Sequence, residues 1–158
     1  MKFPLLALAL FALAALPGCE ALSFDDEPDP SWIERELEAP SENVLWQVSL
    51  QTLSHFDFPL GGGLAPDRLV ASSGWRNTLQ PFKDKGFRNR ATIEIDPLSA
   101  TRFNVRVRVE RQRNRALANP LDLRYAEWDP QPDDEKEAAI LMQHIRSYLD
   151  TELPVGAR

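Results

Sequence analysis

The chain has 158 residues, a formal net charge of −6 and one cysteine. This length fits one small domain, the acidic total argues against non-specific binding to nucleic acid, and a single cysteine excludes an intramolecular disulfide. The charge is uneven, since residues 20–42 carry nine acids and one base, whereas residues 83–115 carry ten bases and four acids. This asymmetry predicts an acidic tether and a basic face on a folded domain.

The first 18 residues have the pattern of a signal peptide. Lys2 precedes an apolar run from Phe3 to Leu16, and the small residue Gly18 lies directly before Cys19. A transmembrane anchor is the alternative, but spanning a bilayer requires about 20 apolar residues and this run is shorter. The sequence therefore predicts an exported protein whose signal peptide covers residues 1–18.

The stretch Leu16-Pro17-Gly18-Cys19 resembles the lipobox of bacterial lipoproteins, although a proline is unusual at its second position. The resemblance implies cleavage after Gly18 and acylation of Cys19, and hence a membrane anchor. Glu20 follows the cysteine in place of the aspartate that retains enteric lipoproteins at the inner membrane. The resemblance therefore implies the outer membrane, with the domain facing the periplasm.

Residues 19–40 predict an acidic tether. Their carboxylates repel one another, and three prolines prevent long regular structure. Ser31 is a potential cap for a single helical turn over residues 32–37. Such a turn would bring Trp32 against the domain or near the membrane.

Ser41 and the apolar spacing after it predict the first long helix, over residues 42–56. The apolar positions recur at helical spacing: Leu45, Val48, Leu53 and Phe56. A glycine triplet at residues 61–63 then breaks the chain. It is not followed by the Lys-Ser/Thr pair of a phosphate-binding loop, so we interpret it as a connection to the sheet.

The clearest pattern in the chain is an antiparallel hairpin. A first strand is expected over residues 67–75, followed by a polar excursion over residues 76–85. Residues 87–96 and 102–110 then alternate strictly between apolar and polar side chains, which predicts two half-buried strands. Pairing Ile93 with Val105 keeps every apolar side chain on the core face.

Five arginines lie at the polar positions of this hairpin, and we expect them to project together into solvent: Arg88, Arg90, Arg102, Arg106 and Arg108. In the register above, Arg88 lies opposite Glu110 and Arg90 lies opposite Arg108. Two interpretations stay open, since such a face can be ordinary solvated surface or a surface that binds an anion or a partner.

Residues 112–132 predict irregular structure with one short edge strand near residues 121–125. Asp133 is expected to cap a final helix that ends near Leu153. The pattern thus predicts an α+β domain over residues 41–153, followed by a tail over residues 154–158. Its three- or four-stranded antiparallel sheet would carry two helices on one face, in the order α-β-β-β-α.

No catalytic or metal-binding constellation is visible in the sequence. His55 and His144 lie on separate predicted helices, no nucleophile elbow surrounds Ser72 or Ser73, and Cys19 is predicted to be acylated. No histidine, cysteine or carboxylate set has the spacing of metal ligands. We therefore expect a protein without catalytic activity, metal or cofactor.

The element order and the stretch from Leu45 to Ser54 resemble an uncharacterised family of short exported proteobacterial proteins. In that family a comparable helix precedes a glycine-rich break and an arginine-bearing hairpin, here the strands Arg88–Ile95 and Phe103–Arg111. The arrangement is more distantly similar to BamC-type small lipoprotein domains. The resemblance covers about residues 42–150 and implies an envelope role without catalysis.

The expected function is that of a lipid-anchored accessory or interaction protein of the bacterial cell envelope. Its partners would be the membrane, through the lipid, and an envelope protein, through the arginine face or a sheet edge. The alternative is a module that binds an anionic envelope ligand, such as a lipid head group or a polyanionic glycan, through the same arginines.

Overall fold

The computed structural model describes residues 28–83, 85–116 and 121–152. The predicted signal peptide, the predicted acylation site Cys19 and the tail over residues 154–158 lie outside the described residues. No helix within the described ranges is long and apolar enough to cross a membrane.

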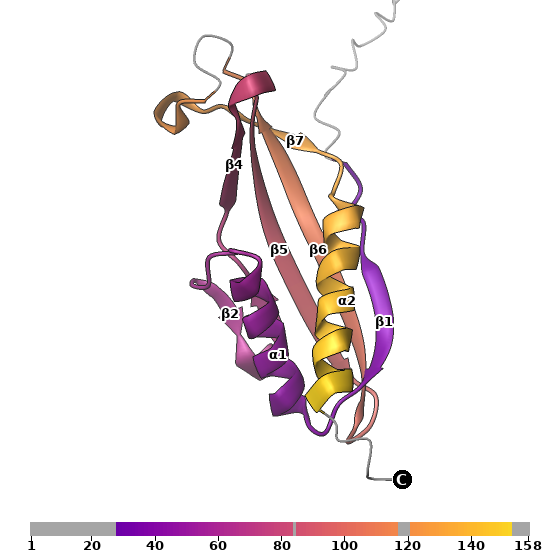
Figure 1. Cartoon of the computed structure of the whole chain (residues 1–158). Helices are drawn as coiled ribbons and strands as arrows, with labels where there is room; N and C mark the ends of the chain where they lie inside the picture. Colours follow the sequence, from indigo (N-terminus) through magenta and orange to yellow (C-terminus); the bar gives the residue numbers. More distant parts are fainter. Residues whose placement is uncertain (1–27, 84, 117–120, 153–158) are drawn as a thin grey trace, which may run out of the picture.

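One antiparallel sheet of seven strands organises the fold (Figure 1). The expectation of three or four strands was therefore wrong. The strands in chain order are β1 (Ile33–Glu38), β2 (Gly63–Ala65), β3 (Val70–Ser72), β4 (Arg76–Gln80), β5 (Lys85–Pro97), β6 (Arg102–Asn114) and β7 (Trp128–Gln131). The two long helices are α1 (Glu42–His55) and α2 (Glu135–Glu152), and short 3-10 turns η1 (Pro66–Arg68), η2 (Pro81–Lys83) and η3 (Leu123–Tyr125) join the strands.

The β5–β6 hairpin is the centre of the sheet, and shorter strands pair with each half of it. Near the hairpin turn, β1 pairs with β6 and β3 pairs with β5, and β2 extends the sheet beyond β3. Toward the far end, β4 pairs with β5 and β7 pairs with β6. β3 lies within the strand that was expected over residues 67–75. The sequence misses β1 because it is an edge strand: four of its six side chains are exposed, and only Leu37 is buried.

The predicted hairpin is present, but its register differs by two residues. Ile93 lies opposite Val107, rather than Val105, and Arg90 lies opposite Glu110. The turn is centred one residue later than expected, on Ala100 rather than Ser99, and the backbone N–H groups of Leu98 and Ser99 both donate to the Arg102 carbonyl oxygen, at 2.9 and 3.0 Å. A shift of two residues preserves the facing of every side chain, which is why the alternation alone does not distinguish the two registers.

The predicted tether ends earlier than residue 40. Residues 33–38 form an edge strand, rather than a solvated segment or the helical turn that Ser31 was expected to cap. Ser31 instead donates its backbone N–H to Asp133, at 2.8 Å, and its hydroxyl to Glu135, at 2.7 Å. The chain is thus held against the start of α2 before it enters the sheet.

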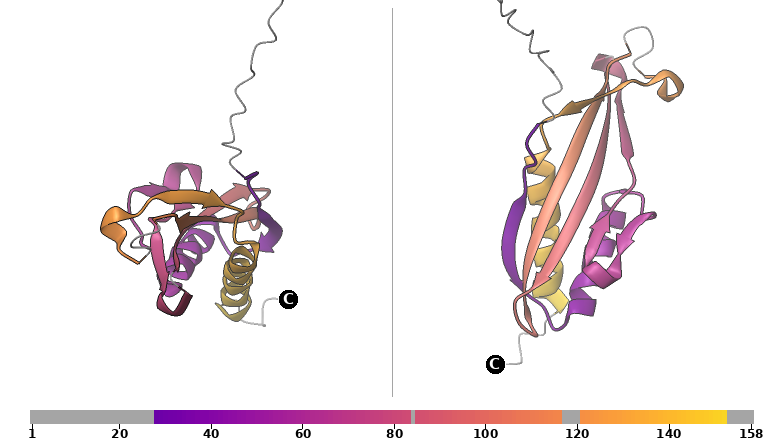
Figure 2. Two further views of the ribbon diagram at one scale, coloured as in Figure 1. Left: turned by 90° about the horizontal axis from the view of Figure 1, so that it is seen from above. Right: turned by 180° about the vertical axis from the view of Figure 1, so that it is seen from behind.

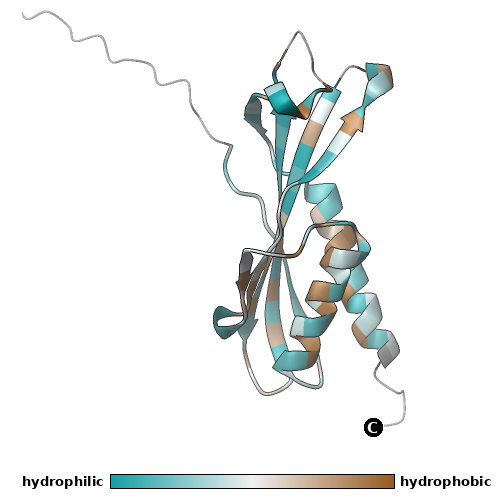
Figure 3. Ribbon diagram, turned by 90° about the vertical axis from the view of Figure 1, so that its left-hand side faces the viewer, coloured by the Kyte–Doolittle hydropathy of each residue, from teal (hydrophilic) through white to brown (hydrophobic). Residues whose placement is uncertain are grey.

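Both helices lie on the same face of the sheet, which leaves the other face without a helical cover (Figures 1 and 2). The apolar faces of both helices pack against the apolar face of the hairpin (Figure 3). Fully buried side chains come from all layers, including Leu45, Leu53, Ile93, Val105, Val107, Val109, Leu141 and Ile145. This burial is the main stabilising term of the domain.

The helix boundaries follow from their caps. Ser41 accepts a hydrogen bond from the Val44 N–H at 3.3 Å, which confirms the predicted cap of α1. In α2 the capping carboxylate is Asp134, which accepts from the Glu137 N–H at 3.1 Å, and not Asp133 as expected. Asp133 is instead used in tertiary contacts, so the sequence placed the cap one residue too early.

The two histidines, which lie on different helices, form a stacked pair. Their ring centroids are 4.6 Å apart, and the imidazole Nδ1 of His144 lies 3.3 Å from the Thr52 hydroxyl. Phe56 and Tyr148 contact the ring of His144 as well. The pair therefore joins the C-terminal end of α1 to the middle of α2.

Lowering the pH below 6.5 is expected to destabilise the domain through His144. Burial of the imidazole, and secondly the nearby charge of His55, hold the pKa of His144 below its usual 6.5. Between the two values the unfolded chain binds a proton that the folded chain does not, so the free energy of unfolding falls as the pH falls. Above pH 6.5 both states are neutral at this site and the effect vanishes.

Urea unfolding of the wild type and of His144→Gln, at about pH 7.5 and about pH 5.5, measures this contribution. The substitution is expected to reduce the loss of stability between the two conditions. An equal loss in both proteins would show that other groups carry the pH dependence. His55→Gln removes the neighbouring ring together with its charge, which is the smaller of the two causes, and is expected to reduce the loss by a smaller amount.

Candidate interaction surface on the uncovered sheet face

The uncovered face of the sheet holds the five arginines that the sequence singled out. Residues at even positions of β5 and β6 project from this face, while their odd neighbours are buried beneath the helices along most of the hairpin. Arg88, Arg90, Arg106 and Arg108 are half-buried and Arg102 is exposed. The structure therefore brings the predicted site residues onto one surface.

This surface is balanced in charge rather than basic, because β1 adds acids that the sequence placed in a tether. Glu34 lies directly opposite Arg106, and Glu38 lies directly opposite Arg102. Side chains that face each other across an antiparallel pair share one side of the sheet. Against five arginines the face carries six carboxylates: Glu34, Glu36, Glu38, Glu94, Asp96 and Glu110.

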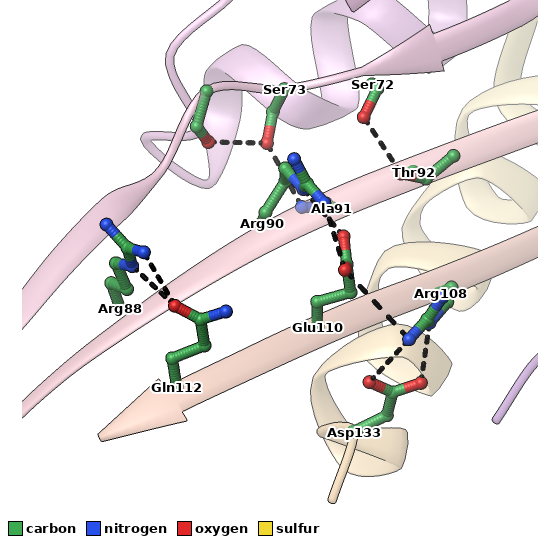
Figure 4. Close-up of polar contacts among 11 residues, drawn as sticks. Ser72, Ser73, Arg88, Arg90, Ala91, Thr92, Arg108, Glu110, Gln112 and Asp133 are labelled. Carbon is green, nitrogen blue, oxygen red and sulfur yellow. Dashed lines mark hydrogen bonds and ion pairs between the residues drawn. The ribbon is translucent and has the colours of Figure 1, made fainter. Parts of the chain in front are cut away.

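Three of the arginines form close ion pairs. Arg90 donates Nε and Nη2 to the two carboxylate oxygens of Glu110, at 2.6 and 3.0 Å (Figure 4). These hydrogen bonds raise the pKa of Arg90. Arg106 and Arg108 each have a carboxylate as close: the Nη2 of Arg106 lies 2.5 Å from Glu94, and the Nε of Arg108 lies 2.7 Å from Asp133.

Arg88 differs from these three, since it forms no ion pair within the described residues. Both its Nε and its Nη2 donate to the single amide oxygen of Gln112, at 2.8 and 2.6 Å (Figure 4). The guanidinium carbon lies 4.3 Å from the centroid of Trp75 and 4.5 Å from that of Trp128. Burial, and secondly the charge of Arg90, lower the pKa of Arg88.

The tryptophans are functional candidates that the sequence reasoning missed. Trp75 also lies under Arg90, with 4.7 Å between ring centroid and guanidinium carbon, and Trp32 lies 5.4 Å from Arg106. These residues are scattered along the sequence, in the predicted tether, at the end of an expected strand and in an expected loop. Only the pairing of the edge strands places them beside the arginines.

The opposite face has a groove where α1 does not reach. It measures about 400 Å³ and lies between the β4 side chains and the first turns of α2. Glu137 accepts from Asn89 at 2.6 Å and from Arg76 at 2.5 Å at its floor. The amide oxygen of the buried Asn89, Oδ1, has no hydrogen-bond donor within the described residues.

The comparisons with known proteins leave the family open. No family model matches the chain. No curated protein matches it either. Within residues 28–83, 85–116 and 121–152, no group of three or more histidine, cysteine and carboxylate side chains is placed to hold a metal ion.

Proposed function

We propose that this chain is a non-enzymatic interaction protein of the bacterial cell envelope, anchored by lipid at Cys19, which binds a partner protein through the uncovered face of its sheet. The anchor and the envelope location rest on residues 16–19 and their resemblance to a lipobox. The binding surface rests on the arrangement of Arg88 between two tryptophan rings.

The Trp75–Arg88–Trp128 stack is the observation that carries the binding proposal. Tryptophan and arginine are the residues most enriched among those that dominate the energy of protein–protein interfaces. The two rings hold the guanidinium in a fixed plane, so a partner loses little of its binding energy to ordering this side chain. A carboxylate of the partner would supply the ion pair that Arg88 does not form within the described residues.

The same geometry makes a polyanionic ligand the weaker candidate. Such a ligand would have to compete with Glu110, Glu94 and Asp133 for the guanidinium groups of the other arginines. It would also meet the carboxylates that β1 contributes, and like charges repel at this range. One stacked arginine suits a single carboxylate at the centre of a protein interface better than an extended anion.

The test is cross-linking in the native cell, with identification of the captured protein. We expect the double variant Arg88→Ala/Trp128→Ala to lose capture of a defined partner by more than about tenfold, as for substitutions at an interface centre. The matched control is Arg102→Ala, which changes an exposed arginine on the same face near the hairpin turn. Unchanged capture by a folded double variant would overturn the proposed surface.

Arg88→Lys separates charge from stacking. Lysine keeps the positive charge but does not have the planar group that stacks between the rings. We expect this variant to lose most of the capture as well. The melting temperature of each variant shows whether a loss of capture comes from unfolding.

A further inference from the structure

The far end of the hairpin exposes large apolar side chains on two short turns. We call this end the distal tip and define it by η2 and η3, which lie at the same end of the molecule (Figure 1). Phe82 on η2 is 103% exposed, which is complete exposure, and Tyr125 and Leu123 on η3 are 64% and 43% exposed. Large apolar groups gathered at one end mark a surface that meets a partner or a membrane.

Basic side chains accompany these apolar groups. Lys83 lies next to Phe82, and Lys85 begins the strand that follows. Neither lysine forms an ion pair within the described residues, whereas Arg124 on η3 is bonded to Asp122 at 2.7 Å. An exposed aromatic ring with lysines beside it fits the boundary between anionic head groups and acyl chains.

The chain also enters the domain on the half that carries the tip. Pro28 lines a pocket with the β6 residues from Arg108 to Gln112 and with Pro130 of β7. The nine peptide units from Cys19 to Pro28 span at most about 30 Å. From Glu110, in the middle of this contact, the start of β5 at Lys85 lies about 17 Å away, and the hairpin turn at Arg102, where Leu98 is also exposed, lies about 26 Å away.

We propose that the distal tip inserts Phe82 into the lipid surface to which the chain is anchored, with Lys83 and Lys85 against anionic head groups. This inference rests on the anchoring in the proposed function. The tip is the end of the hairpin nearer to the tether, and it carries the exposed rings of Phe82 and Tyr125. Contact at two points, the lipid and the tip, would hold the long axis of the hairpin upright and present the uncovered sheet face sideways.

The test uses the full lipidated chain in vesicles of phosphatidylethanolamine and phosphatidylglycerol. Acylation of Cys19 leaves no other thiol in the wild type, so Phe82→Cys provides a single site for an environment-sensitive fluorophore. The matched control is Leu98→Cys at the opposite end of the same hairpin. We expect the label at position 82 to be blue-shifted and at least about threefold less accessible to aqueous iodide than the label at position 98.

The outcomes separate the tip from the anchor. Equal iodide quenching at positions 82 and 98 in vesicle-bound protein would overturn insertion of the tip while leaving the anchor intact. Labelling of two thiols per chain, or loss of the protein from the vesicles, would overturn the anchor itself. A variant that combines Phe82→Cys with Lys83→Gln and Lys85→Gln tests the lysines. In vesicles rich in phosphatidylglycerol, we expect its label at position 82 to be less protected from iodide. Unchanged protection of the label would show that the lysines do not contribute to insertion.

Discussion

Replacing Val107 with aspartate is expected to unfold the domain or to leave it only partly folded. Val107 is fully buried in β6, with Ile93 of β5 on one side and Ile33 of β1 on the other. A carboxylate at this position would be desolvated without a partner, at a cost of several kcal/mol. The total stability of a small domain is about 5–15 kcal/mol, so one such change removes much of it.

Urea unfolding followed by circular dichroism measures the effect. Thr101→Asp is the matched control, because it introduces the same carboxylate into the exposed turn of the same hairpin. We expect this control to change the free energy of unfolding by no more than about 0.5 kcal/mol. Similar stability of the two variants would contradict the assignment of Val107 to the buried face of β6. Arg106→Asp is a poor control, because it would break the contact with Glu94.

Replacing Cys19 with serine is expected to abolish membrane anchoring. Serine has no thiol to acylate, and each buried methylene of an acyl chain contributes about 0.8 kcal/mol to membrane binding. Because the lipobox resemblance implies several chains on one residue, their loss would leave only the contact at the distal tip. The variant is expected to persist as an uncleaved precursor or to become soluble.

Two measurements check this result: incorporation of labelled fatty acid, and fractionation of membranes after a high-salt wash. The wild type is expected to take up label and to stay with the membranes, and the variant to do neither in its soluble form. A wild type that takes up no fatty acid, with a variant that fractionates in the same way, would end the lipoprotein interpretation.

The long elements were predictable from local pattern because each carries many side chains with one period. The β5–β6 hairpin alternates over residues 88–96 and 102–110, and α1 begins at the cap that its sequence indicates. Most of the short strands were not predictable in this way. β3 lies within the strand expected over residues 67–75, but β2 has only three residues and β4 buries no side chain fully, so neither periodicity nor hydrophobicity marks these two strands.

The candidate site was also predictable only in part. Parity along the hairpin was sufficient to place the five arginines on one surface, since a shift of the register by two residues leaves the facing unchanged. Glu94 and Glu110, which pair with Arg106 and Arg90, lie in the hairpin itself. The other partners were not visible, because each comes from another part of the chain. Asp133 lies 25 residues from Arg108, and Trp128 lies 40 positions beyond Arg88.

By itself, the sequence predicted export and an anchor at residues 1–19. It determined the central hairpin, the two helices, and the side of the hairpin that faces solvent. These properties depend on residues that are close along the chain. Only the tertiary structure decided the electrostatic character of that face. Pairing of β1 with β6 places Glu34 and Glu38 opposite Arg106 and Arg102, which turns an apparently basic surface into a balanced one. At the far end of this surface, Arg88 lies against two tryptophan rings. Charge balance across a sheet depends on which strands are neighbours, and hydrogen bonding between distant segments sets that order.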